Sequence, residues 1–312
     1  MLEMPGNGGD ANTETQSIAV LGGGGFIGTY LTLNLLRMGE RLHLLSHKTD
    51  PGFVSPRGQL QTFRGSIEDE ASLVRCFSGC DLLYHLVGII AETRTKTFQK
   101  TVADGTARVV SAARSAGVKK IIYLSALGAT SDADSLYFKT KGLAERHIIT
   151  SGLQYTIFRP SIVYGKEDKF INKIATMVRR LPVLPVIGDG LFKLQPVYVE
   201  ELCAVLAVAG RKDFTAGKTY DVGGPEQLTY IEILDIIQRV LGRRRLKMHM
   251  PMVLIRSAAA MLELVMKPAP LTRDMLKMMA AGSTCDHTVV EKDFGVKFSR
   301  LEAQLHGYLR SR

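Results

Sequence analysis

The chain has 312 residues, of which 46% are apolar and 22% charged, with a formal net charge of +10. This composition is ordinary for a globular protein, and the length allows one large core or two lobes. The positive charge suits anionic ligands, but no nucleic-acid motif and no basic stripe interleaved with aromatic residues accompanies it. Composition and motifs together argue against a nucleic-acid partner.

The first 16 residues are rich in glycine, asparagine and acidic residues. This predicts a disordered tail, because a signal peptide needs an apolar stretch and a transit peptide is rich in arginine and poor in acids. No run of about eighteen uncharged apolar residues occurs, so we expect no transmembrane segment. The four cysteines are scattered, without a neighbouring histidine or cysteine pair. They predict reduced thiols, no metal site and a cytoplasmic location.

The most informative local pattern is an apolar strand that runs into a glycine-rich turn and a helix, over residues 17–36. The glycines follow the spacing Gly22-x-x-Gly25-x-x-Gly28 or Gly23-x-Gly25-x-x-Gly28. A helix N-terminus offers backbone N–H groups and a positive dipole end to a phosphate, and glycines let the phosphate come close. The strand before and the helix after favour a dinucleotide-binding loop over a flexible surface turn.

Strand and helix patterns alternate from residue 18 to about residue 158. We expect strands at 17–21, 41–46, 60–63, 81–87, 119–125 and 154–159, and helices at 26–38, 69–78, 97–116 and 136–151. Several of these strands are nearly continuous apolar runs, which suit a parallel sheet covered on both faces. The expected fold class is therefore α/β, a doubly wound parallel Rossmann-type sheet with its ligand at the carboxyl ends of the strands.

After Pro160 the chain becomes richer in proline and glycine. The pattern predicts a helix at 168–180, an extended excursion, a helix at 199–210 and a strand at 218–222, then mostly helical residues with extended pieces near 246–250. We expect residues 17–165 and 196–224 to form the dinucleotide-binding domain. Residues 166–195 and 225–312 would form a smaller, mostly helical C-terminal lobe for a substrate or a partner.

Tyr137 and Lys141 lie four residues apart in the predicted helix 136–151 and so share one face. A nearby ammonium favours the phenolate and lowers the pKa of a tyrosine. Such a tyrosine can exchange a proton with a carbonyl or hydroxyl oxygen while a hydride moves to or from nicotinamide. The alternative is an ordinary surface pair, but Tyr137 is the only one of ten tyrosines with a lysine four residues on.

Together these motifs resemble the short-chain dehydrogenase/reductase superfamily, which includes NAD-dependent epimerases and dehydratases. The details are most similar to its atypical extended type, in the group that contains the NADPH-binding alpha-subcomplex subunit nine of respiratory complex I. The similar stretches are 21–28, 118–128, 141–145, 158–165 and 195–201. The resemblance implies a nicotinamide cofactor and, as an alternative to a free protein, a position peripheral to a membrane complex.

The resemblance also implies roles for individual residues. Tyr137 would be the catalytic acid or base, Lys141 would tune it and bind the nicotinamide ribose, and Ser125 would contact the substrate. The implied cofactor contacts are Gly22, Gly24, Gly25, Phe26, Ile27 and Gly28 at the pyrophosphate, Leu86, Val87 and Gly88 at the adenine-side ribose, Leu124, Ser125, Tyr137 and Lys141 at the nicotinamide ribose, and Pro160, Ser161 and Ile162 beside the carboxamide.

The choice of cofactor follows from the end of the second predicted strand. An NAD site usually has an acidic residue there, which accepts from the ribose 2′-hydroxyl. Here Ser46, His47 and Lys48 follow one another and no acid occurs before Asp50. These side chains can donate to a 2′-phosphate, which favours NADP(H), with NAD(H) as the alternative. His47 replaces what is often an arginine in the relatives.

The chain departs from the family's pattern in two respects. Val102 stands where the family often has a helper asparagine, and Ala126 and Leu127 stand where extended members tend to have the working hydroxyl. We therefore keep two hypotheses. The first is an NADP(H)-dependent oxidoreductase or epimerase/dehydratase relative with an unknown carbonyl or hydroxyl substrate. The second is a non-catalytic NADP(H)-binding accessory, assembly or redox-sensing protein of a respiratory complex I-type assembly.

Two further features have simpler interpretations. His85 lies within a buried strand pattern, which predicts a core histidine rather than a base. Arg243, Arg244 and Arg245 precede an apolar, methionine-rich helix at 252–266. A basic patch beside such a helix can contact a membrane surface or a partner, whereas the simpler interpretation is a lobe helix packed on the sheet domain.

Overall fold

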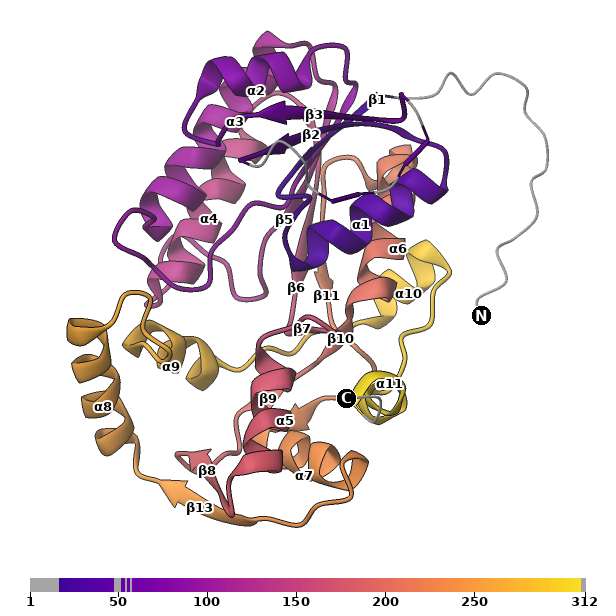
Figure 1. The fold of residues 1–312 in the computed structure, drawn as a ribbon. Coiled ribbons are helices and arrows are strands. Elements are labelled where there is room, and N and C mark those ends of the chain that lie inside the picture. The colour runs from indigo at the N-terminus through magenta and orange to yellow at the C-terminus, as the bar shows by residue number, and fades with distance from the viewer. Residues whose placement is uncertain (1–16, 48–51, 54, 57, 310–312) are drawn as a thin grey trace.

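The computed structural model describes residues 17–47, 52–53, 55–56 and 58–309. Seven strands form one parallel sheet in the order β11-β6-β5-β4-β1-β2-β3 (Figure 1). They are β1 (Ser17–Leu21), β2 (Arg41–Ser46), β3 (Leu60–Arg64), β4 (Leu82–His85), β5 (Lys120–Leu124), β6 (Gln154–Pro160) and β11 (Lys218–Val222). This order confirms the predicted doubly wound Rossmann-type sheet. The tail expected over residues 1–16 lies outside the described residues.

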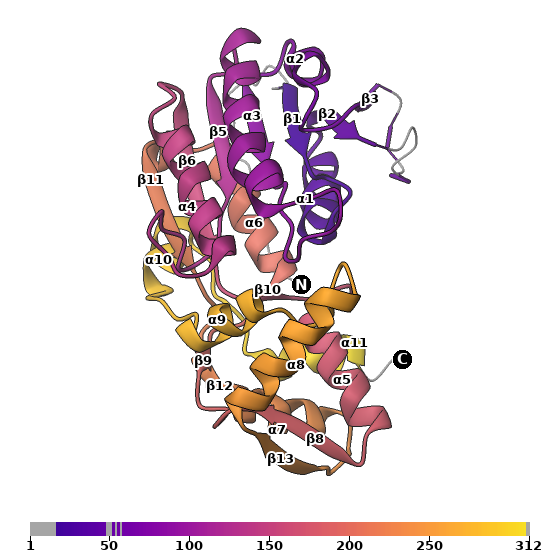
Figure 2. The ribbon, with the colours of Figure 1, turned by 90° about the vertical axis from the view of Figure 1, so that its left-hand side faces the viewer.

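Helices cover both faces of the sheet (Figures 1 and 2). On one face lie α1 (Phe26–Arg37) and α6 (Val199–Gly210), and on the other lie α2 (Glu70–Phe77), α3 (Asp104–Ser115) and α4 (Leu136–Ile149). Successive strand residues point to opposite faces, so Val20 packs toward α1 and α6 while Leu21 packs toward α2 to α4. Both side chains are fully buried, which explains why these strands are apolar at nearly every position.

A second lobe continues from the carboxyl end of β6 and has its own apolar core. Its core helices are α5 (Phe170–Arg180), α7 (Tyr230–Val240) and α11 (Leu301–Leu309), and α8 (Met252–Val265) and α9 (Arg273–Ala281) lie at its edge. Three strand pairs complete it: β7 (Val163–Tyr164) with β10 (Val197–Tyr198), β8 (Val183–Ile187) with β13 (Leu246–Met250), and β9 (Lys193–Leu194) with β12 (Leu228–Thr229).

Two details differ from the sequence-based expectation. The helix predicted over 97–116 begins as a π-helix, η1 (Gln99–Ala103), before it continues as α3; π-helical turns often occur at functional sites. The helix α10 (Thr288–Phe294) belongs to the expected lobe by sequence but packs on β11 and α6 instead. Its Phe294 ring lies 5.2 Å from that of Tyr220 on β11, because apolar side chains there complete the core of the sheet domain.

A short 3-10 turn, η2 (Asp213–Thr215), connects α6 to β11. Among the helices in the described part of the chain, none combines the length and the apolar character needed to cross a bilayer.

Candidate functional site

The strand order reverses between β1 and β4, which lie side by side at the centre of the sheet. In doubly wound sheets the carboxyl ends of such strands form the ligand crevice. Gly22 directly follows β1, and a Cβ placed on it would lie 3.1 Å from the backbone of Leu86 and of Val87, which follow β4. Its φ of +81° is also in the left-handed region that favours glycine. The backbones of the two strand ends therefore meet at a position that only glycine suits.

The glycine turn leads directly into α1. The Gly25 N–H donates to the Gly22 carbonyl oxygen at 2.9 Å, and Gly25 is the N-cap of α1 without a capping side chain. The first N–H groups of α1 lack intrahelical partners and lie at the positive end of the helix dipole. A Cβ on Gly28 would collide with the Gly22 carbonyl oxygen, whereas one on Gly24 would meet nothing within 4 Å. This turn can therefore cradle an anionic group.

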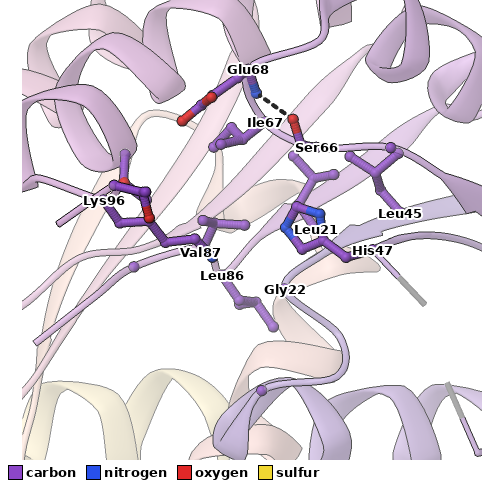
Figure 3. A pocket seen from close by; sticks show the side chains of 15 residues that line it. Leu21, Gly22, Leu45, His47, Ser66, Ile67, Glu68, Leu86, Val87 and Lys96 are labelled. Atoms are coloured by element: carbon purple, nitrogen blue, oxygen red, sulfur yellow. Dashed lines mark hydrogen bonds between the residues drawn. The ribbon is translucent and has the colours of Figure 1, made fainter. Parts of the chain in front are cut away.

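A cavity of about 430 Å³ opens beside this turn (Figure 3). Six residues of the predicted cofactor site line it: Gly22, Gly25, His47, Leu86, Val87 and Gly88. The sequence did not predict the residues that complete the lining, which are Leu21, Leu45, Gly65, Ser66, Ile67, Glu68, Thr95, Lys96 and Thr101. Residues 65–68 directly follow β3, so the rule that ligands bind at the carboxyl ends of strands could have identified them. Thr95 and Lys96 lie in an irregular segment without a local signal.

The other predicted site residues do not line this cavity. They are Gly24, Phe26, Ile27, Gly28, Ser46, Leu124, Ser125, Tyr137, Lys141, Pro160, Ser161 and Ile162, while Lys48 lies outside the described residues. The Ser161 hydroxyl already has hydrogen-bond partners in the lobe. It donates to the Ser283 carbonyl oxygen at 2.8 Å and accepts from the Gln195 N–H at 3.2 Å. The cavity thus corresponds to only part of the predicted site, namely six of its residues.

Lys141 is buried and joins the ends of β4 and β5. Its Nζ donates to the Leu124 carbonyl oxygen at 2.6 Å and lies 4.8 Å from the centre of the Tyr123 ring. A Cβ on Gly88 would lie 3.4 Å from the same Nζ, so the lysine reaches the backbone of a cavity residue. Burial lowers the pKa of Lys141 to about 7, although the charge of Glu145 acts in the opposite direction. Lys141 can therefore gain or lose a proton near neutral pH.

Tyr137 behaves differently from the expectation. It shares the predicted helix face with Lys141, because both lie on α4, and its ring packs 5.7 Å from that of Phe98. Burial raises the pKa of Tyr137 to about 12, so the predicted lowering by an adjacent ammonium is wrong. The reason is that burial penalises the phenolate and also favours a neutral Lys141. Tyr137 is a protonated phenol at neutral pH.

The core near Lys141 contains His85, while the position where the family often has an asparagine is apolar in this chain. Val102 is fully buried, while His85 Nε2 lies 2.9 Å from the Thr106 hydroxyl and the His85 ring lies 5.1 Å from that of Tyr123. Burial first, and the charge of Lys141 second, lower the pKa of His85 to about 3. His85 is thus a neutral core histidine, in line with the sequence-based interpretation.

Ser125 directly follows β5 and is buried. Its backbone N–H donates to the Phe158 carbonyl oxygen at 2.7 Å. Its hydroxyl oxygen has no hydrogen-bond partner among the described residues. A buried hydroxyl normally has a partner, so a group that Ser125 can bind fits this position.

Comparison with known proteins assigns the chain to a family. Residues 18–223 match the family model described as the NAD dependent epimerase/dehydratase family. The chain is 27% identical to mitochondrial NADH dehydrogenase [ubiquinone] 1 alpha subcomplex subunit 9 of Arabidopsis thaliana, over 98% of the chain and 78% of that protein. It is 25% identical to a ceramide reductase of Caulobacter vibrioides, over 79% and 77% of the two chains.

Solved structures share the fold at low sequence identity. The NADPH-dependent quinone oxidoreductase QOR2 of Escherichia coli, complexed with NADPH, superposes with a TM-score of 0.76 and 20% identity. The match covers 93% of this chain and 99% of that structure. The similarity therefore extends over both the sheet domain and the lobe.

Proposed function

Since this chain belongs to the NAD dependent epimerase/dehydratase family, we propose that it binds a nicotinamide dinucleotide beside the Gly22 turn, with NADP(H) favoured over NAD(H). The observation that carries this proposal is the meeting of the Gly22 turn with the backbone of Leu86 and Val87, next to a cavity of about 430 Å³. The uncapped N-terminus of α1 would bind the pyrophosphate, because its free N–H groups and its dipole favour an anion.

The remaining contacts follow the carboxyl edge of the sheet. Leu86, Val87 and Gly88 would lie against the adenine-side ribose. Leu124 and Ser125 would border the nicotinamide ribose, where the unpartnered Ser125 hydroxyl fits a polar ligand. Lys141 would bind the same ribose, and residues 160–162 would lie beside the carboxamide.

The preference for NADP(H) rests on the end of β2. His47 lines the cavity, and neither Ser46 nor His47 can repel a 2′-phosphate as an acid would. Lys48→Glu should weaken NADPH binding at least about tenfold and leave NADH binding nearly unchanged, because the new carboxylate repels only the extra phosphate. Fluorescence titration of both cofactors tests this. Equal losses for both would contradict the assignment of this residue.

The reaction that the residues favour is reduction of a carbonyl compound. A bound reduced nicotinamide supplies a hydride for the carbonyl carbon. Tyr137, protonated at neutral pH, would donate its phenolic proton to the carbonyl oxygen, which yields an alcohol. Lys141, with a pKa of about 7, would stabilise the resulting phenolate and take part in returning its proton.

Two observations favour a second function. Val102 occupies the position of the expected asparagine and is fully buried, and the Arabidopsis relative is named as a subunit of NADH dehydrogenase. The alternative is therefore a non-catalytic accessory, assembly or redox-sensing protein that keeps its cofactor, peripheral to a membrane complex of the respiratory complex I type.

One experiment separates the two functions. The purified protein is examined for the absorbance of bound reduced nicotinamide and then incubated with a panel of carbonyl compounds. Turnover that Tyr137→Phe abolishes, with NADPH affinity unchanged, would establish the reductase and exclude the accessory function. A cofactor that stays reduced through the whole panel and does not exchange would instead support the accessory function.

A further inference from the structure

The helix α8 is apolar on two sides, and only one of them is packed. Ile255 and Ala259 form the inner side and pack with Leu276 of α9. The expectation that this helix packs on the sheet domain is therefore wrong, because its core contacts lie within the lobe. The opposite side, which we call the outer face of α8, consists of Val253 (74% exposed), Leu254 (58%), Met261 (68%), Leu264 (86%) and Val265 (80%).

These five side chains lie on one side of α8, where the exposed Ser257 separates Val253 and Leu254 from the other three. At about 100° per residue they fall within an arc of about 120° on the helix. Figure 1 shows α8 at the outer edge of the lobe, and in Figure 2, where that side faces the viewer, α8 lies at the front of the lobe. A helix that is apolar all round is normally buried, and an exposed apolar patch of this kind marks an interaction surface.

The chain around the outer face is strongly basic. Residues 243–267 contain six arginines and lysines but a single acid, Glu263. Glu263 is already neutralised, because its carboxylate lies 2.8 Å from Nε of Arg273. Within the described residues, only Lys247 of these six has an ion-pair partner, Asp235. The other five are Arg243, Arg244, Arg245, Arg256 and Lys267, of which Arg245 donates to the backbone carbonyl oxygens of Val178 and Arg179. A partner that matches this surface is therefore anionic around its edge and apolar at its centre.

The size of the outer face distinguishes between kinds of partner. A helix of 14 residues is about 21 Å long, and one of its sides covers roughly 200 Å². A stable protein–protein interface buries about 800 Å² on each partner. A lipid interface needs no matched surface, and an apolar helix stripe with flanking basic residues is sufficient for peripheral binding.

We propose that the outer face of α8 docks on an anionic lipid bilayer. The five apolar side chains enter between the headgroups, while Arg256 and Lys267 contact anionic headgroups. Apolar burial and electrostatic attraction then act together, as reversible membrane binding requires. This proposal does not depend on the cofactor or on the reaction, because α8 lies outside the cavity lining.

Vesicle flotation of the full chain tests the proposal. The vesicles are phosphatidylcholine alone or an equal mixture of phosphatidylcholine and phosphatidylglycerol. We expect the protein to float with the mixed vesicles, to float less with pure phosphatidylcholine, and to be released partly by high salt. Leu264→Asp with Val265→Asp should reduce flotation at least about tenfold, because carboxylates do not enter the anionic interface.

The control is Val289→Asp, since Val289 is a valine 51% exposed on α10, away from the outer face. It should float as the wild type does, and circular dichroism checks that all variants fold. Three results would overturn the proposal: no flotation of the wild type with mixed vesicles, flotation unchanged by the double variant, or an equal loss for the control. A wild-type dimer that the double variant dissociates would also overturn it, because a second copy would then cover the face.

Discussion

The carboxylate of Asp274, on α9, accepts a hydrogen bond from the backbone N–H of Tyr137, on α4, at 3.1 Å. It also accepts from the Leu136 N–H at 2.7 Å and from the Ser135 hydroxyl at 2.9 Å. These donors lie at the N-terminus of α4, where backbone N–H groups lack intrahelical partners and a negative charge complements the helix dipole. A lobe helix therefore fixes the start of the helix that carries Tyr137 and Lys141.

Removal of this contact should destabilise the protein. Asp274→Ala should lower the free energy of unfolding by about 1–2 kcal/mol, because it removes a charged cap from α4. Asp274→Asn keeps one acceptor oxygen and should lose less. Urea unfolding followed by circular dichroism measures both variants. An alanine variant as stable as the wild type would show that the contact contributes nothing to folding.

The sequence predicts α4 but not its link to Asp274. The apolar spacing after Ser135 indicates the helix, and Ser135 itself is its N-cap residue. Asp274, in contrast, lies 137 residues beyond Tyr137 and has no local pattern that points to α4. Contacts of this kind depend on how the lobe packs on the sheet domain, which local spacing does not encode.

The same distinction explains which parts of the fold and the site were predictable. Each strand and helix of the sheet domain has its own periodic spacing of apolar residues. The order of these elements could therefore be predicted from the sequence up to β11. The glycine turn is also local, and the structure places Gly22 and Gly25 at the cavity. The pKa of Tyr137 was not predictable, because spacing places Lys141 on its helix face but does not reveal the burial of either group.

Two glycines of the turn should respond differently to an added methyl group. Gly28→Ala should lower the free energy of unfolding by about 1–3 kcal/mol or more, since its Cβ would collide with the Gly22 carbonyl oxygen. Gly24→Ala should leave the stability of the cofactor-free protein unchanged, because no atom lies within 4 Å of its Cβ. If Gly24 lies at the pyrophosphate, this variant should still bind NADPH at least about tenfold more weakly. Thermal unfolding and NADPH titration of both variants give the comparison. Equal destabilisation by the two substitutions would contradict the geometry of the turn.

The ion pair between Glu145 and Arg159 should contribute strongly to stability. Glu145 lies on α4 with only 4% of its side chain exposed, and its Oε1 accepts from Nε of Arg159 at 2.9 Å. Glu145→Ala should cost about 3 kcal/mol, because it leaves a partly buried guanidinium without its partner. The control is Asp81→Ala, which breaks the exposed pair with Lys119 and should cost about 0–1 kcal/mol. Guanidinium unfolding of both variants checks the difference, and similar losses would contradict it.

The buried Lys141 should make stability depend on pH in a defined direction. Its pKa is about 7 in the folded protein, whereas an unfolded lysine has a pKa of about 10.4. Between these values the unfolded state binds more protons, so the free energy of unfolding rises with pH, by up to about 1.4 kcal/mol per pH unit. Below pH 7 both states are protonated, and the full cost of burying the charge remains.

Lys141→Met should remove this dependence. At pH 7 the variant should be more stable than the wild type by a few kcal/mol, and its advantage should shrink as the pH rises. The measurement is guanidinium unfolding from about pH 7 to about pH 8.5. The range ends there because burial raises the pKa of Cys76 and Cys80, so ionisation of these thiols in the unfolded state opposes the trend at higher pH. Lys139→Met, at an exposed position of the same helix, is the matched control and should keep the wild-type slope. A wild type whose stability falls over this range, or a Lys141 variant with an unchanged slope, would show that the buried lysine stays charged.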